Sequence, residues 1–342
     1  MPSAADSIRA EIAKAGGSIP FSRFMELALY GPGGFYSMTG HAGRRGDFIT
    51  SPEVGPLFGL VLSRAIDDVW RRCGSPDGFT IIDAGAGPGT LARSILAASP
   101  DCLRKGHYVA VETSAAQREM HPEGINSTDR MPEAVEHGVV VANELLDNLP
   151  FELWVADGGW KQAHATAAGD AFNEILVSGM PAFPLPERAP LGTRAPVQSA
   201  AAEWLRDALA ALRHGSIFVI DYCTARTIQV AAMPWREWLR TYAGHERGSH
   251  YLKDPGSQDI TAQVLVDQLA VVREPDAVRS QAQFLELWGI GELVEEGRRV
   301  WRESASAPTL AALKMRSRIS EAEALLDPRG LGAFTVLEWR LD

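Results

Sequence analysis

The chain has 342 residues, of which 46% are hydrophobic and 22% are charged, a balance typical of a folded protein with one large core or two modest ones. Its formal net charge of −10 argues against nonspecific nucleic-acid binding, which depends on a basic surface, so we expect no nucleic-acid partner. Its three cysteines fit neither a disulfide framework nor metal-site spacing, and no apolar run approaches the ~20 residues that cross a bilayer. We therefore expect no metal, no membrane partner and, because the N-terminus lacks an apolar signal core, a cytoplasmic location.

The first part of the chain is expected to be helical. Apolar residues at helical spacing predict helices over 7–15 and 22–30, and each of these segments is followed by glycines. Ser51 followed by Pro52 and Glu53 is the pattern of a helix start with Ser51 as the N-cap, and this helix should run to about residue 72. We therefore predict that residues 1–75 form a helical extension that caps the site of the domain that follows.

The stretch from 79 to 96 predicts a ligand site. An apolar strand over 79–83 ends in Asp83, and a turn with glycine at every second position follows: Gly85, Gly87 and Gly89. A strand, a tight glycine turn and a helix, in that order, bind a nucleotide-sized ligand at the carboxyl end of a parallel strand. The spacing differs from the G-x-G-x-x-G of dinucleotide binders and from a P-loop, but it resembles the first motif of class I S-adenosylmethionine-dependent methyltransferases. The alternative is a glycine turn that binds no ligand.

A second predicted strand, over 107–112, ends in Glu112. In Rossmann-like sheets, an acid about 20 residues beyond the glycine turn accepts hydrogen bonds from ribose hydroxyls, and Glu112 fits that place. The alternative is a solvated carboxylate at a helix start, since Thr113 and Ser114 can cap the next helix.

A third group of polar residues follows a buried strand over 139–143. Asn143 and Glu144 come at its carboxyl end, and Asp147 lies just beyond. In an open α/β sheet this edge faces the ligand crevice. Because three polar side chains in an apolar run are costly unless they are paired, a functional role is expected, although Asp147 alone is also compatible with a helix cap.

The rest of the chain completes one α/β domain with two insertions. Strands over 216–221 and 334–341 complete a Rossmann-like sheet, so residues 76–342 form the core, interrupted by insertions at about 151–198 and 224–280. The first insertion carries a hairpin signal, Ala-Asp-Gly-Gly at 156–159, and a proline-rich connection over 181–196; a helix over 200–212 follows it. We expect the second insertion to fold over the crevice as part of a substrate lid.

Longer motifs resemble one family along nearly the whole chain. They are Gly-Asp-Phe-Ile-Thr-Ser-Pro-Glu at 46–53, Asn-Glu-Leu-Leu-Asp-Asn-Leu-Pro at 143–150 and Asp-Pro-Gly-Ser-Gln-Asp-Ile-Thr-Ala at 254–262. Together they resemble the MidA-type S-adenosylmethionine-dependent methyltransferases, a family with protein-arginine methyltransferases among its members. The resemblance implies S-adenosylmethionine as the cofactor, held by Asp83, Gly85, Gly87, Gly89 and Glu112, with Gly46 beside it and Asn143 at its methionine end. The short segment after Glu112 contains no clear strand over 125–129, so the acid that often contacts the adenine amine is not assigned.

The resemblance also implies an arginine acceptor, for which carboxylates are needed. A guanidinium has a pKa above 12, so its methylation requires acids that orient it and localise its charge. The predicted catalytic residues are Glu144, Asp147 and Asp47. The predicted acceptor-binding residues are Glu53, His250 and Tyr251. The alternatives are a helix-dipole role for Glu53, a turn-binding role for Asp47 and a structural role for His250.

Three functions remain open at this point. The first is methyl transfer to an arginine side chain of a protein acceptor. Two departures from the family pattern, Cys223 in place of a glycine and Gln263 in place of a histidine, keep a small-molecule O- or N-methyltransferase open as the second. The third is a cofactor-binding assembly factor with little turnover. A homodimer is one option for the oligomeric state.

Overall fold

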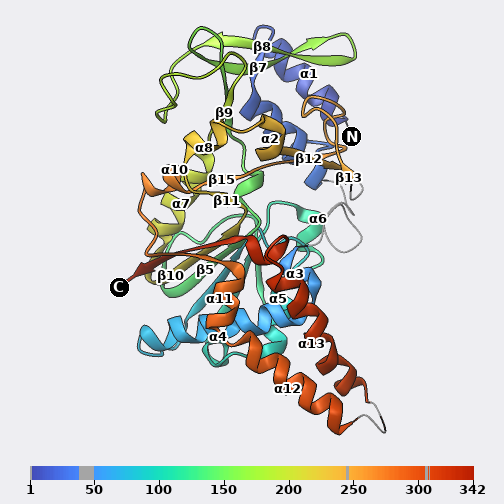
Figure 1. Ribbon diagram of the computed structural model, residues 1–342, viewed down its shortest axis with the longest axis vertical. Helices are drawn as coiled ribbons and strands as arrows, with labels where there is room; N and C mark the ends of the chain where they lie inside the picture. Colours follow the sequence, from blue (N-terminus) through green and yellow to red (C-terminus); the bar gives the residue numbers. More distant parts are fainter. Residues whose placement is uncertain (1, 38–49, 244–245, 305–306, 308) are drawn as a thin grey trace.

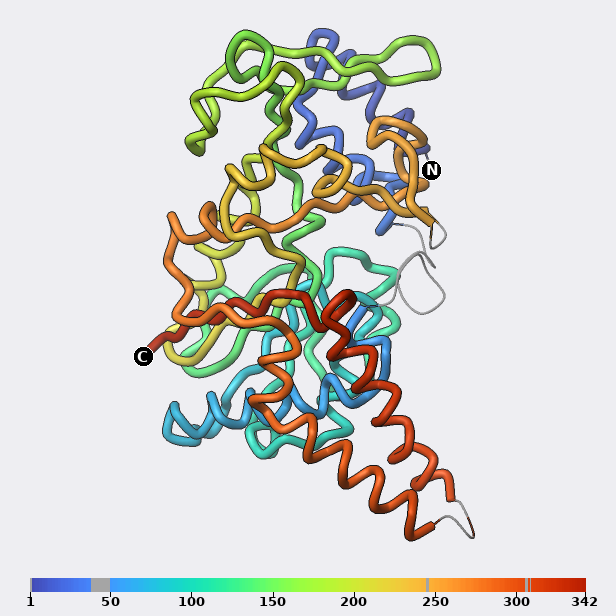
Figure 2. Tube along the Cα trace, in the orientation of Figure 1, coloured from blue at the N-terminus to red at the C-terminus, as the bar shows by residue number. Residues whose placement is uncertain are grey.

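The computed structural model describes residues 2–37, 50–243, 246–304, 307 and 309–342. The molecule has two lobes stacked along its long axis (Figure 1). The core lobe is built on a seven-stranded sheet. The second lobe, which we call the cap lobe, consists of the described residues of 2–37, 151–198 and 227–262. The chain begins in the cap lobe and ends on a strand of the core sheet (Figure 2).

The core sheet is the Rossmann-like sheet expected from the sequence. In spatial order its strands are β4 (Asn126–Thr128), β3 (His107–Val111), β2 (Thr80–Ala84), β5 (Val135–Asn143), β10 (Leu212–Asp221), β17 (Thr335–Leu341) and β16 (Ala277–Ser280). The first five strands are parallel, whereas β17 is antiparallel to both of its neighbours. The strand order reverses at β2, which lies between β3 and β5. Open α/β sheets bind ligands at this switch point, beyond the carboxyl ends of the strands.

Helices bury both faces of this sheet, which explains why its central strands read as continuous apolar runs. Ile81 belongs to the apolar cluster under the first set of helices, and its neighbour Ile82 belongs to the cluster on the opposite face. The first set is α4 (Pro56–Arg72), α5 (Thr90–Ala98), α11 (Gln281–Leu287), α12 (Ile290–Glu303) and α13 (Leu310–Leu326). The opposite face is covered by α7 (Ser199–Ala211) and α10 (Val266–Ala270). In Figure 2, α12 and α13 run side by side away from the sheet.

The cap lobe has its own core, drawn from three separate parts of the chain. Phe24, Phe151 and Trp238, one from each part, belong to the same buried cluster. Its elements are α1 (Ala4–Lys14), β1 (Ile19–Pro20), α2 (Phe21–Tyr30), β6 (Glu152–Ala156), β7 (Trp160–Ala168), β8 (Ala171–Ser178), β9 (Arg194–Val197), α8 (Thr227–Ala231), α9 (Trp235–Trp238), β12 (Leu239–Ala243), β13 (Glu246–Arg247) and β14 (Asp259–Ala262). The predicted hairpin is confirmed as β6 and β7, in which Ala156 pairs with Trp160. Of residues 1–75, α1 and α2 pack in the cap lobe, whereas α4 packs on the core sheet.

Three local predictions were wrong. The helix expected over residues 51–72 is interrupted, because Pro56 disfavours helical backbone at Gly55, and it forms as α3 (Ser51–Val54) and α4. Thr50 occupies the N-cap position of α3, while the Ser51 hydroxyl instead donates to Gln281 Oε1 at 2.8 Å. The segment 125–129, for which no strand was predicted, forms the three-residue strand β4 beside β3.

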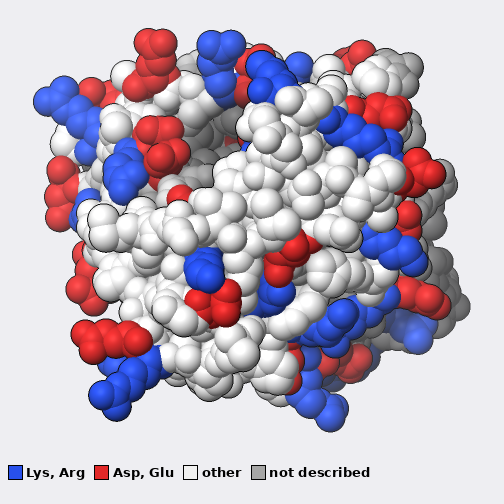
Figure 3. All heavy atoms as spheres, turned by 90° about the horizontal axis from the view of Figure 1, so that it is seen from above, with Lys and Arg blue, Asp and Glu red and all other residues white. Residues whose placement is uncertain are grey.

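Two observations concern membranes and charged partners. Within the described ranges, every helix is too short or too polar to cross a bilayer. On the face of the molecule seen in Figure 3, acidic and basic side chains are interspersed.

Candidate functional site

A cavity of about 740 Å³ lies at the carboxyl ends of β2, β3 and β5, where the core lobe meets the cap lobe. Its described walls come from the glycine turn, the loop after β5, α2 and the segment that follows it, and α3, α6 (Ala115–Arg118) and α7. Six carboxylate side chains line it: Glu26, Glu53, Asp83, Glu112, Asp129 and Glu144. Among the described lining residues, Arg130 is the only basic side chain. The cavity is therefore a site that favours cationic ligands.

The glycine turn forms one wall with its backbone. Gly85, Gly87 and Gly89 have φ of +71°, +54° and +80°, which side-chain-bearing residues rarely adopt. A Cβ at Gly85 would lie 2.9 Å from Leu145 Cδ1, so a side chain at this position would displace the Leu145 side chain. Gly85 and Gly87 line the cavity, whereas Gly89 occupies the N-cap position of α5 and is not among the lining residues.

Glu112 holds the glycine turn and the next loop together. Its Oε2 accepts a hydrogen bond from Gly87 N at 3.0 Å, and its Oε1 accepts one from Ser114 N at 2.8 Å. A carboxylate has about four acceptor positions, so Glu112 retains capacity for hydroxyl donors of a ligand. Asp83 lies deeper, where burial raises its pKa to about 7 although the Tyr108 hydroxyl donates to it at 2.8 Å. Both side chains are in the predicted place, on the wall of the cavity.

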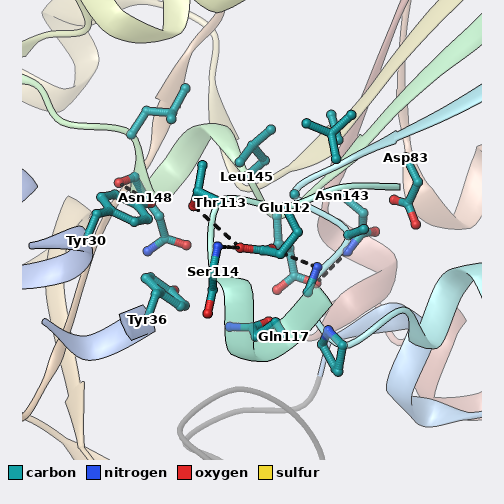
Figure 4. Close-up of a pocket in the computed structure, with 18 of the residues that line it drawn as sticks. Tyr30, Tyr36, Asp83, Glu112, Thr113, Ser114, Gln117, Asn143, Leu145 and Asn148 are labelled. Carbon is teal, nitrogen blue, oxygen red and sulfur yellow. Dashed lines mark hydrogen bonds between the residues drawn. The ribbon is translucent and has the colours of Figure 1, made fainter. Parts of the chain in front are cut away.

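Asn143 and Gln117 present unsatisfied oxygens at the cavity. Asn143 Oδ1 and Gln117 Oε1 are buried and accept no hydrogen bond from any described residue. Buried polar atoms are nearly always paired, so two orphans on one cavity wall are expected to accept hydrogen bonds from a ligand. Figure 4 shows Asn143 and Gln117 beside Glu112, with Tyr30 and Tyr36 at one end of the cavity and Asp83 at the other.

Glu144 has an unusual backbone and a perturbed carboxyl group. Its φ of +51° lies in the left-handed region, where non-glycine residues are strained and where functional residues are often found. Its Oε2 accepts from the Tyr222 hydroxyl at 3.1 Å, and its Oε1 accepts from Asn143 Nδ2 at 3.2 Å. Burial raises the pKa of Glu144 to about 7, and the nearby charge of Glu53 adds to that rise. A carboxyl group that titrates near neutral pH is suited to accept a proton during a reaction.

The structure places Asp147 behind the cavity wall. Its side chain is buried, accepts a hydrogen bond from the Thr261 hydroxyl, and is not among the residues that line the cavity. Burial, followed by the charge of Asp221, raises the pKa of Asp147 well above its ordinary value. Asp221 in turn accepts from the backbone N–H of Leu146 at 3.0 Å and of Asp147 at 3.3 Å. These contacts give Asp147 a role in holding the loop and leave it out of contact with a ligand in the cavity.

The remaining predicted residues divide in three ways. Glu53 lines the cavity from α3. His250 and Tyr251 do not reach it: Tyr251 is buried in the cap lobe, where its ring packs on Phe21 and its hydroxyl donates to Glu174. His250 packs on Tyr251 with 4.1 Å between ring centroids. Gly46 and Asp47 lie outside the described residues.

The sequence did not indicate several lining residues. Tyr30 and Tyr36 reach the cavity from the cap lobe, and Asn148 reaches it from the loop after β5. Asp129 directly follows β4, the strand that was not predicted, and therefore stands at the carboxyl edge of the sheet. Asn148 belongs to the motif at 143–150, but the spacing of that motif alone gave no reason to assign this side chain to a ligand.

These features fit the expected cofactor, S-adenosylmethionine. The glycine turn lines the cavity with backbone, and Glu112 offers acceptors for ribose hydroxyls. The orphan oxygens of Asn143 and Gln117 offer acceptors for ammonium or amine donors. The carboxylates complement the positive charge of a sulfonium.

Comparisons with known proteins agree with S-adenosylmethionine as the cofactor. A family model described as "Putative S-adenosyl-L-methionine-dependent methyltransferase" matches residues 61–282. The chain is similar to the mitochondrial protein arginine methyltransferase NDUFAF7 homolog of Drosophila melanogaster, with 32% identity over 192 residues, which cover 47% of this chain and 44% of the fly protein. It is 36% identical to human NDUFAF7 over 84 residues, which cover 24% of this chain and 19% of the human protein. The matched stretches thus span less than half the length of these relatives.

A solved structure resembles the whole molecule. It is a Burkholderia thailandensis protein bound to S-adenosyl-homocysteine, with a TM-score of 0.81 and 29% identity, covering 99% of this chain and 92% of that one. A second, native crystal structure from the same organism matches with a TM-score of 0.77.

Proposed function

The chain belongs to the MidA-type family of S-adenosylmethionine-dependent methyltransferases, and we propose that it methylates an arginine side chain of a protein acceptor. The observation that carries this proposal is the acidic cavity, in which Glu53 and Glu144 lie close enough for the charge of one to raise the pKa of the other. The curated relatives, which are named protein arginine methyltransferases, support it.

The cofactor would bind along the glycine turn. Glu112 would accept hydrogen bonds from the ribose, Asp129 would face the adenine amine, and Asn143 would face the methionine end. When bound, S-adenosylmethionine supplies the methyl group on a positively charged sulfur and the leaving group for an in-line displacement.

Glu53 and Glu144 would bind and orient the acceptor. Two carboxylates can hold the planar guanidinium through charge-assisted hydrogen bonds and draw its positive charge away from the nitrogen that forms the new N–C bond. As that bond forms and the S–C bond breaks, the nitrogen loses a proton, which Glu144 is placed to accept. The pKa of Glu144, about 7, suits this task.

The test is methyl labelling of a lysate from cells that lack this gene. The purified protein and S-adenosylmethionine labelled in its methyl group are added, and the lysate is then divided into protein and low-mass fractions. We expect label in protein and methylarginine in its acid hydrolysate, with the initial rate reduced ~100-fold or more for Glu144→Gln. Glu203→Gln, an exposed carboxylate on α7, is the matched control and should be as active as wild type. Label on other side chains would contradict the arginine assignment.

A small-molecule acceptor remains the second candidate because apolar side chains also line the cavity. These are Met131, Leu145, Leu149 and Trp204, which pack against the apolar cluster that includes α7. Label that appears in the low-mass fraction, with none in protein, would favour this candidate.

A further inference from the structure

The loop that carries Glu144 is held by both lobes. On the core side, Glu144 N donates to Ile220 O at 2.8 Å, and Leu146 N donates to Asp221 Oδ2 at 3.0 Å. The following residues form the short 3-10 turn η3 (Leu146–Asn148) and turn toward the cap lobe. A strained backbone conformation persists only where the surrounding contacts hold it. The conformation of Glu144 therefore depends on the contacts at both ends of this loop.

Strand β14 of the cap lobe holds that other end. Asn148 Nδ2 donates to both carboxylate oxygens of Asp259, at 3.1 and 3.3 Å, and to Ile260 O at 3.1 Å. Two residues further along the strand, the Thr261 hydroxyl donates to Asp147. Alternate residues of a strand point to the same side, so Asp259 and Thr261 both face the loop. Asp259 is 1% exposed and Asn148 is 6% exposed, so their charge-assisted bond is shielded from water.

Asp259 also contacts the aromatic end of the cavity. Its Oδ1 accepts a hydrogen bond from the Tyr36 hydroxyl at 3.1 Å. Tyr36 stacks on Tyr30 with 5.5 Å between ring centroids and 17° between ring planes. Tyr30 completes a ring of contacts, because its hydroxyl donates to Asn148 O at 3.1 Å. The Asp259 carboxylate thus links the Tyr36 side chain to Asn148 in the loop after β5, and Tyr30 contacts the same asparagine directly.

We propose that Asp259 and Thr261 are positioning residues that set the loop carrying Glu144, and that Asp259 couples this loop to the part of the cavity wall formed by Tyr30 and Tyr36. The proposal rests on the proposed function in one respect, since it assigns Glu144 to turnover. It gives a role to the Asp-Ile-Thr motif at 259–261, which does not line the cavity. It also explains why the acid of Asp147 faces β14: Thr261 anchors the loop through it.

The experiment compares Asp259→Asn and Thr261→Val with Thr241→Val. Thr241 lies on β12 in the same three-stranded sheet and is 5% exposed, as is Thr261, but its hydroxyl donates to Ser249 O instead of the loop. Three quantities are measured: deuterium uptake of residues 144–150, the dissociation constant for S-adenosylhomocysteine, and the initial rate of methyl labelling of a fixed lysate protein fraction.

We expect faster exchange over residues 144–150 in both test variants and wild-type exchange in Thr241→Val. The labelling rate should fall about tenfold for Asp259→Asn and a few-fold for Thr261→Val, while the dissociation constant changes less than about twofold. Tyr36→Phe keeps the ring and removes one hydrogen bond to Asp259, so it should speed exchange at the same residues to a smaller extent. If Asp259→Asn does not fold, Thr261→Val and Tyr36→Phe decide the question.

Wild-type exchange over 144–150 in the test variants would overturn the proposal, as would uniformly faster exchange across the cap lobe that Thr241→Val reproduces. The proposed function can fail separately. If wild type labels no protein, the arginine assignment falls, while deuterium uptake still decides whether β14 positions the loop.

Discussion

Replacing Tyr222 by phenylalanine should move the pH dependence of turnover to higher pH. The Tyr222 hydroxyl donates to Glu144 Oε2 at 3.1 Å and thereby lowers the pKa of that carboxyl group, which burial has raised to about 7. The variant loses the donor but keeps the ring, which packs edge-on against Phe334 with 4.4 Å between centroids. The pKa of Glu144 should therefore rise, because its charged form loses a hydrogen bond that its neutral form needs less.

The size of the effect follows from the strength of one hydrogen bond. Such a bond to a charged group contributes ~1.5–3 kcal/mol, and 1.36 kcal/mol corresponds to one pKa unit, so a displacement of about one pH unit remains after water replaces part of the bond. Turnover needs the carboxylate, so its acid limb should lie near pH 7 in wild type and near pH 8 in the variant. Rates should then differ roughly fivefold at pH 7 and become nearly equal by about pH 9.

The assay is the initial rate of methyl labelling from pH 5.5 to 9.5 at saturating S-adenosylmethionine. Tyr242→Phe, the same change in the cap lobe, is the control and should give the wild-type profile. An acid limb that stays in place, or moves to lower pH, would refute the assignment of this limb to Glu144.

Three further changes test other parts of the site. Gly85→Val should abolish detectable binding of S-adenosylhomocysteine in calorimetry, because the new Cβ would meet Leu145 at 2.9 Å. Gly74→Val is the control, since Gly74 has a comparable φ of +83° and open space around it, and this variant should bind normally. Equal loss of binding in both variants would point to misfolding. Glu112→Gln should weaken that binding about tenfold, since the amide cannot accept from both Gly87 and Ser114 as the carboxylate does, and unchanged affinity would remove Glu112 from the cofactor site. Glu144→Gln should raise the melting temperature of the ligand-free protein at pH 8, by roughly 2 °C, and leave it nearly unchanged at pH 5. The pKa of Glu144 is about 7 in the folded protein and about 4.5 in the unfolded chain, so between these values the folded state binds a proton that the unfolded state does not. The wild-type protein therefore loses stability as the pH rises from about 4.5 to 7. Glu144→Gln has no carboxyl group to ionise and does not lose this stability.

The sequence predicted the core sheet well because fully buried strands carry a strong signal. The strands around Ile81, Val140 and Val219 are apolar on both faces, and each is bounded by a turn or by polar residues. Strand β4 escaped prediction because it has three residues, two of which are exposed, and so shows no apolar pattern. The break at Gly55 was missed because the apolar spacing continues through it, although Pro56 is itself a signal against an unbroken helix.

The site was predicted where it follows from strand ends and not where it depends on tertiary contacts. Glu112, Asn143 and Glu144 come directly after buried strands, so topology alone brings them to one edge. Asp147 satisfies the same rule, but the η3 turn rotates its side chain toward Thr261. The cap lobe assembles from three distant segments, and only its packing decides that Tyr30 and Tyr36 face the cavity while Tyr251 does not.

A crystal structure with S-adenosylhomocysteine would show what surrounds the position from which the methyl group has left. We predict that the homocysteine sulfur faces the carboxylates of Glu53 and Glu144. A sulfur directed instead at Leu149 and Trp204, or a cofactor bound away from the glycine turn, would contradict this arrangement.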